Sequence, residues 1–177
     1  TKYAVGLGEL EAPYELDLIA TEATARGEGH VLNGRKSAVY GGQVAEVFLI
    51  AAKFEGKLAM FEVAASAASV TGYAMMDGGG AAEVLLDDAP ATLLIADAGA
   101  ALQDAVNAGI VALCSEAVGA MDVLHAMTVE YLGTRKQFGR PIGSFQALQH
   151  RAVDMLTEIE QARSITMISG PTRSMIA

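Results

Sequence analysis

Residues 131–155 read YLGTRKQFGRPIGSFQALQHRAVDM and mark the point where one long helical pattern stops and a second begins. Gly139, Pro141 and Gly143 interrupt the apolar repeat between the two patterns, so a short loop is predicted here. Two long helices joined by a short loop pack antiparallel, but two helices alone do not make a stable core. Further helices, from the same protein or from another subunit, are therefore expected to cover the pair.

The helical patterns on both sides of the loop have apolar residues every three or four positions. The upstream helix is predicted to end near 131–133, and its apolar positions are Leu102, Val106, Ile110, Leu113, Ala117, Met121, Leu124 and Met127. The downstream apolar positions are Phe145, Leu148, Ala152, Met155, Ile159 and Ala162. Gly170-Pro171 is predicted to end or kink the second helix.

A series of short strands is predicted before the helices, up to about residue 96, because brief apolar and β-branched runs are broken there by glycine, asparagine and aspartate. The predicted strands cover 2–7, 17–25, 30–40, 46–53, 58–63, 69–75 and 82–86. Asn33-Gly34 indicates a two-residue hairpin turn, and 87–90 is predicted to break the chain after the last strand. About seven strands at this spacing favour a closed barrel or a sandwich.

The loop carries side chains whose combination indicates nucleotide binding. Arg135 and Lys136 follow a helix C-terminus, where the helix dipole alone favours cations. The dipole does not explain why Gln137 and Phe138 come next. A diphosphate held by a planar guanidinium and an amide, with an aromatic ring against the nucleotide, uses Arg135, Gln137 and Phe138 together.

The quoted segment resembles the acyl-CoA dehydrogenase family, in which an Arg-x-Gln-Phe-Gly-x-Pro-Ile loop leads into a Phe-Gln-x-x-Gln-His helix. Residues 31–36 are similar to the hairpin before the family's flavin-facing strand, so the resemblance covers essentially the whole chain. It implies an α+β, multi-domain fold. An acyl-CoA dehydrogenase-like β-barrel middle domain is expected at 1–97, and the first two helices of the antiparallel C-terminal helical bundle at 98–177.

The resemblance also implies FAD-dependent α,β-dehydrogenation of an acyl-CoA thioester, an oxidoreductase reaction on a CH–CH group in fatty acid metabolism. In the family this loop reaches an FAD held mainly by an adjacent subunit, and we assign that role to Arg135, Gln137 and Phe138. Gln146 falls at a family position near the cofactor. The implied partners are acyl-CoA and further subunits in a homo- or hetero-oligomer, with a dimer of dimers expected.

No catalytic residue is assigned. The family's carboxylate base usually lies beyond residue 177, and the alternative position early in the long helix falls on Gly109. Asp104 is interpreted as an acid favoured by the dipole near the helix start. Glu116 interrupts an apolar stretch, so we expect it to pair with a cation on a neighbouring helix, with a catalytic role as the less favoured alternative.

Two stretches depart from the family pattern. The family's Thr-Glu-Pro-Gly-x-Gly-Ser-Asp segment, whose hydroxyls serve flavin and substrate, corresponds to 8–15, where only Glu9 and the charge of Glu15 are kept. The aromatic-Ile-Thr strand over the flavin ring becomes Ala-Val-Tyr at 38–40. The chain therefore resembles the small subunit of heteromeric acyl-CoA dehydrogenases such as pimeloyl-CoA dehydrogenase, a degenerate subunit that completes a partner's FAD site without its own catalysis.

Composition limits the other classes of function. The net charge of −9 disfavours nucleic acid as a partner, and the three histidines lack the spacing of a metal site. Cys114 is the single cysteine and is expected to be a buried thiol, which is consistent with a cytoplasmic location. No membrane span is expected. The chain begins without methionine and ends in a helical pattern, so a fragment of a longer protein is expected.

Three functions remain open on these grounds. The first is a catalytic subunit that binds its own FAD and acyl-CoA, and the second is the half-site subunit described above. The third is a binding module, made of a barrel and a helical hairpin, without redox chemistry. The order of the motifs around Arg135 disfavours the third.

Overall fold

The computed structural model describes residues 1–13 and 15–169. The chain forms two compact units, Thr1–Gln103 and Asp104–Ala177. This division lies in the first turns of helix α1 (Gly99–Thr134). The domain bounds predicted from sequence, 1–97 and 98–177, stay a prediction.

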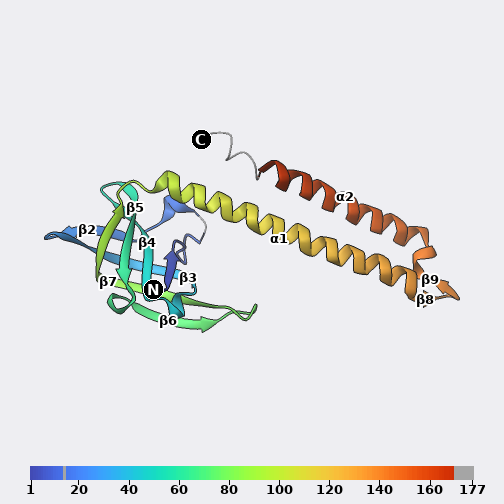
Figure 1. The fold of residues 1–177 in the computed structure, drawn as a ribbon, viewed down its shortest axis with the longest axis horizontal. Helices are drawn as coiled ribbons and strands as arrows, with labels where there is room; N and C mark the ends of the chain where they lie inside the picture. The colour runs from blue at the N-terminus through green and yellow to red at the C-terminus, as the bar shows by residue number, and fades with distance from the viewer. Residues whose placement is uncertain (14, 170–177) are drawn as a thin grey trace. The chain divides into compact units, whose positions relative to one another are not determined.

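The first unit is a β-barrel, as the sequence predicts (Figure 1). Its strands are β1 (Tyr3–Gly6), β2 (Glu22–Arg26), β3 (Gly29–Tyr40), β4 (Val47–Phe54), β5 (Lys57–Ala64), β6 (Ser69–Ala74) and β7 (Gly80–Ile95). The closed path runs β2-β3-β7-β5-β4 and returns to β2 where Glu22 pairs with Lys53. β1 lies parallel to β4, and β6 adds antiparallel to β7.

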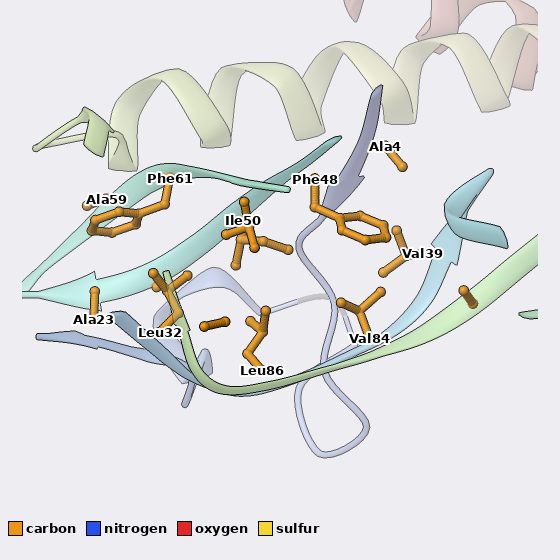
Figure 2. Close-up of a cluster of buried hydrophobic side chains, with 14 residues drawn as sticks. Ala4, Ala23, Leu32, Val39, Phe48, Ile50, Ala59, Phe61, Val84 and Leu86 are labelled. Atoms are coloured by element: carbon orange, nitrogen blue, oxygen red, sulfur yellow. The ribbon is translucent and has the colours of Figure 1, made fainter. Parts of the chain in front are cut away.

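The barrel interior is filled by side chains that point inward from every strand of the closed path (Figure 2). Phe48 and Ile50 on β4, Phe61 on β5, Leu32 on β3 and Val84 on β7 are all fully buried. Burying one such side chain stabilises the fold by roughly 1.5–3 kcal/mol. Successive side chains of β4 point to opposite faces, so Phe48, Ile50 and Ala52 pack in this core, whereas Leu49 and Ala51 pack in a second cluster with Ile19.

The predicted turn at Asn33-Gly34 is wrong, because β3 passes through both residues. The β2–β3 hairpin turns earlier, between the paired residues Arg26 and Gly29, with Gly27 at φ 61°. Gly34 instead lies against another part of the backbone: a Cβ placed there would be 2.8 Å from the Cα of Thr21. The glycine is thus needed for close approach, one of the two roles this residue type serves.

The predicted break at 87–90 is also wrong, because β7 continues to Ile95. Asp88 has φ 46° and Pro90 is paired with Val31 of β3. The Asp88 carboxylate accepts hydrogen bonds from the Asn33 amide and the Arg26 guanidinium at 3.0 and 2.8 Å. These contacts with β2 and β3 stabilise β7 at aspartate and proline residues that normally end a strand.

Both predicted helices are confirmed, as α1 and α2 (Gln146–Ser169). Between them lie the short strands β8 (Lys136–Gln137) and β9 (Arg140–Pro141). Single turns of 3₁₀ helix complete the chain: η1 (Leu16–Leu18), η2 (Gly42–Val44), η3 (Ala65–Ala67) and η4 (Ile142–Ser144). The predicted end at Gly170-Pro171 lies outside the described residues.

In the second unit α1 and α2 run antiparallel, since a residue later in α1 contacts a residue earlier in α2. Asp122 accepts a hydrogen bond of 2.5 Å from Arg163, and the His125 Nε2–H donates 3.1 Å to the carbonyl of Ala152. Each contact is a hydrogen bond between a polar group of α1 and a polar group of α2. The pair is therefore held in a fixed register by polar contacts.

The contact between Gly34 and Thr21 generates a stability prediction. Gly34→Ala should lower the free energy of unfolding by about 1–3 kcal/mol, because the new methyl group overlaps the Thr21 backbone. Gly29→Ala on the same strand is the control, since its Cβ would meet nothing nearer than 4.0 Å. Urea unfolding of both variants tests this, and equal stabilities would contradict the packing described here.

Candidate functional site

The site predicted from sequence is a tight turn between the two helices of the second unit (Figure 1). Gln137 pairs with Arg140, so Phe138 and Gly139 are the two central residues of a hairpin. They have φ 53° and 77°. Two successive positive φ angles are typical of a type I′ turn, which normally selects glycine or asparagine. Phe138 occupies such a position at a cost of about 1–2 kcal/mol.

The turn presents the predicted side chains to solvent. Arg135, Gln137 and Gln146 are exposed, and the Phe138 side chain is 91% exposed. Within the described residues, neither the Arg135 guanidinium nor the Gln137 side-chain amide has a hydrogen-bond partner. Arg135, Gln137 and Phe138 share one turn, whereas Gln146 starts α2. The donors of Arg135 and Gln137 are therefore available to a ligand or to another chain.

The backbone around the turn is well supported. The amide of Ile142 donates to the carbonyl of Arg135 at 2.8 Å, and the Gln149 side chain donates to the carbonyl of Gly143 at 2.8 Å. Gly143 itself lies so close to α1 that a Cβ there would be 2.9 Å from the carbonyl oxygen of Leu132. The glycine of the sequence motif thus lets the chain return against α1.

Aromatic contacts support the same region. The Arg140 guanidinium carbon lies 4.2 Å from the centroid of the Phe145 ring, and the Phe138 and Phe145 rings meet edge to face at 6.1 Å. A cation over an aromatic face is favourable by about 0.5–1 kcal/mol at an exposed site. Arg140 is therefore a structural cation of the turn, while Arg135 has no such contact among the described residues.

The two helices expose broad apolar surfaces. Among the described residues of the second unit, only Val118 and Ile159 are buried hydrophobic residues. Leu102, in the first turns of α1, is also buried, but it belongs to the first unit. Exposed examples include Leu113, Met127 and Ile165, at 60–67%. By length and composition alone α1 is apolar enough to cross a membrane. A core helix of a soluble protein meets the same criterion, so the absence of a membrane span stays a prediction.

Two other sequence expectations have outcomes in the second unit. Cys114 is exposed, so the expected burial of this thiol is wrong within the described structure. Glu116 is also exposed and forms no ion pair with the residues described, whereas Asp122 pairs with Arg163. Both expectations assumed that the apolar run around them was buried by neighbouring helices, and the described chain provides only α2.

A buried ion pair in the barrel was missed by sequence reasoning. The Lys36 ammonium donates to the Glu9 carboxylate at 2.7 Å and to the carbonyl of Leu7 at 3.1 Å, and the Lys36 side chain is fully buried. The Thr21 hydroxyl donates to the same carboxylate oxygen at 2.6 Å. The sequence signal for this pair is a lysine within an otherwise apolar strand pattern, because a lysine is almost never fully buried without a partner.

The Glu9 carboxylate is held in its charged form. Burial alone would raise the pKa of Glu9, but hydrogen bonds from Lys36, the Thr21 hydroxyl and the amides of Ala20 and Thr21 lower it to about 2. Burial lowers the pKa of Lys36, and the Glu9 carboxylate opposes that shift. The Glu9 carboxylate thus accepts four hydrogen bonds from the protein itself. It ties β3 to the loop before β2 and is a structural group.

Comparisons with known proteins agree with this architecture. Residues 97–169 match the model of the acyl-CoA dehydrogenase C-terminal domain. FadE27, an acyl-CoA dehydrogenase of Mycobacterium tuberculosis, is 33% identical over 80% of this chain and 39% of its own length. The probable acyl-CoA dehydrogenase YngJ of Bacillus subtilis is 29% identical over 92% of this chain and 47% of its own.

Solved structures extend the agreement to both units. The Tcur3481-Tcur3483 steroid ACAD superposes with a TM-score of 0.80 at 27% identity, covering 99% of this chain and 48% of the solved chain. The chain spans less than half the length of these relatives. The matched regions include the barrel, α1, the turn and α2.

The ion pair of Glu9 generates a pH prediction. Because the folded pKa of about 2 lies below the unfolded value near 4.5, the stabilisation is present above pH 4.5 and is lost as the pH falls towards 2. The full shift corresponds to roughly 3 kcal/mol. Glu9→Gln should therefore flatten the loss of stability between pH 5 and pH 2.

Chemical unfolding of wild type and Glu9→Gln across this pH range measures the effect. The control is Glu11→Gln, which changes an exposed carboxylate of the same loop and should leave the wild-type pH dependence intact. Parallel pH profiles for wild type and Glu9→Gln would refute the structural role of the pair.

Proposed function

Because this chain belongs to the acyl-CoA dehydrogenase family, we propose that it is part of a flavoenzyme that introduces a double bond between the α and β carbons of an acyl-CoA thioester. FAD supplies the two-electron acceptor when it is bound. The family model at 97–169 and the relatives that align over both units support this reaction class. Acyl-CoA as substrate and a cytoplasmic location are parts of the same proposal.

The observation that carries the proposal is the exposed turn at 135–138. The residues there fit a dinucleotide: Arg135 offers a planar fork of donors suited to a phosphate, and Gln137 offers an amide donor. Phe138 projects an almost fully exposed ring from a strained backbone position. Strain of this kind persists where a position serves function, because a glycine would remove it. We therefore assign diphosphate contacts to Arg135 and Gln137, and a ring contact with the nucleotide to Phe138.

The apolar surfaces of α1 and α2 support an oligomeric assembly. Side chains such as Leu124, Val153 and Ile168 are 59–75% exposed, and apolar surface of this extent is normally covered by another element or chain. We propose that the FAD touched by the turn is held mainly by an adjacent subunit. Gln146, exposed at the start of α2, is assigned a secondary contact with the same cofactor.

The half-site subunit is the second candidate function. In it the chain completes a partner's FAD site and performs no chemistry of its own. A specific observation favours it: the barrel strand at 38–40 has an irregular backbone, with Ala38 at φ 50°, and Tyr40 is 67% exposed. The catalytic base is not assigned in either case, since the family's usual position is expected beyond residue 177 and the alternative position early in the long helix is occupied by Gly109.

Removal of the guanidinium tests the proposed function directly. Arg135→Ala should weaken FAD binding by the purified assembly about 10- to 100-fold, because a charge-assisted hydrogen bond to phosphate contributes roughly 1.5–3 kcal/mol. Titration followed by flavin fluorescence gives the dissociation constant. Arg151→Ala removes the same charge from an exposed position of α2 and should change it less than about twofold. Equal effects of both variants would reject the assignment.

Phe138→Gly separates ligand contact from folding. Glycine adopts the positive φ without strain, so thermal stability should be unchanged or higher despite the lost contact with Phe145. FAD affinity should fall about 2- to 10-fold, because an aromatic contact contributes roughly 0.5–1.5 kcal/mol. Thermal melts and FAD titrations on the same preparation provide the two readouts. A variant with lower stability and unaltered FAD affinity would mean that Phe138 serves only the turn.

A further inference from the structure

Strand β3 carries an irregularity between Lys36 and Val39. Lys36 pairs with Val84 and Val39 pairs with Ala82, so both Ser37 and Ala38 lie opposite the single residue Glu83. This is a β-bulge. Ala38 adopts φ 50° within it, a conformation that costs a residue with a Cβ about 1–2 kcal/mol. A bulge of this kind persists only if neighbouring groups hold it in place.

The carbonyl of Gly8 accepts from the Ser37 amide at 2.9 Å, and Glu83 provides the side-chain contacts. Its carboxylate accepts hydrogen bonds from the Ser37 hydroxyl at 2.8 Å, the Ala38 amide at 3.3 Å and the Arg35 guanidinium at 2.9 Å. The Tyr73 hydroxyl on β6 donates to it at 3.3 Å. One carboxylate therefore joins β3 and β6 to β7 around the bulge.

The carboxylate is charged at neutral pH. Burial opposes ionisation, but the hydrogen bonds from Ser37, Ala38 and Arg35 lower the pKa of Glu83. Burial and the neighbouring charge of Glu83 raise the pKa of Tyr73, which keeps the phenol as a hydrogen-bond donor. The bulge is thus fixed by an anion whose partners are all donors.

This arrangement has a consequence for a flavin ring. The pyrimidine side of the ring presents two carbonyl oxygens and the nitrogen N1, which need donors from the protein, and a single N3–H group, which needs an acceptor. On this strand the Ser37 hydroxyl and the Ala38 amide already donate to Glu83. A carboxylate offers only acceptors, and the Tyr40 side chain projects beside them with 67% exposure. The surface therefore does not fit the ring that the family resemblance places over 38–40.

We propose that Glu83 locks the Ser37–Ala38 bulge in a conformation that excludes a flavin ring from this barrel, so that the chain serves one FAD, through the turn at 135–138, and not two. The inference rests on the proposed function, which places a cofactor at that turn. It adds that a flavin completed by this chain must have its ring against a different subunit with a regular strand at this position.

Amide hydrogen exchange tests the lock without any cofactor. In Glu83→Ala the Ala38 amide should exchange at least about tenfold faster than in wild type, while the core amides of Phe61 and Val84 remain protected. The Tyr73 hydroxyl is the other acceptor near this amide, and Glu83 positions it. Glu22→Ala, which removes an exposed glutamate of β2, should leave the exchange unchanged. Equal exchange in Glu83→Ala and wild type would overturn the lock.

Flavin counting tests the consequence. FAD is added in excess to the chain alone and to the assembly in which it is made, and bound FAD per polypeptide is measured after desalting. The chain alone should retain essentially none, and the assembly at most one FAD for every two polypeptides. A homo-oligomer of this chain that holds one FAD per polypeptide would overturn the inference while leaving the proposed function intact. Absence of FAD from every form would reject the proposed function, and the inference with it.

Discussion

The turn at Phe138-Gly139 depends on two successive positive φ angles, and the presentation of Arg135 and Gln137 depends on the turn. The close approach of Gly143 to Leu132 brings the chain back along α1 directly after it. Without this reversal the guanidinium, the amide and the exposed ring would not share one surface. A strained phenylalanine at its tip is the clearest local indication that the segment is shaped for a ligand.

The barrel shows the opposite situation, because its polar groups are already paired. Glu9 is surrounded by donors that include the fully buried Lys36, and Glu83 takes the donors of the bulge. The first cluster stabilises the barrel, and the second shapes the strand that would face a flavin. Free donors on the turn and occupied donors on the barrel together support the proposal that this chain completes a cofactor site held elsewhere. The sequence shows the same contrast: the segment around the turn keeps the family pattern, and the barrel segments at 8–15 and 38–40 depart from it.

Sequence reasoning predicted the elements whose signal is local. Short windows of sequence contain the information for α1 and α2, for the turn with its glycines and for the barrel strands. It failed at Asn33-Gly34, where the glycine serves contact with Thr21 rather than a turn. The Glu83 bulge could not be predicted either, since its partners Ser37 and Tyr73 lie 46 and 10 residues away along the chain. Cys114 was placed by its apolar neighbours, although the surface that would bury it is not part of the described chain.

The most direct test of this account is an experimental structure of the purified assembly with FAD bound. We expect the Arg135 guanidinium to lie within hydrogen-bond distance of the FAD diphosphate, with the flavin ring against the barrel of a different subunit. A structure in which Arg135, Gln137 and Phe138 are buried in their own protomer, or in which no nucleotide reaches their turn, would contradict it.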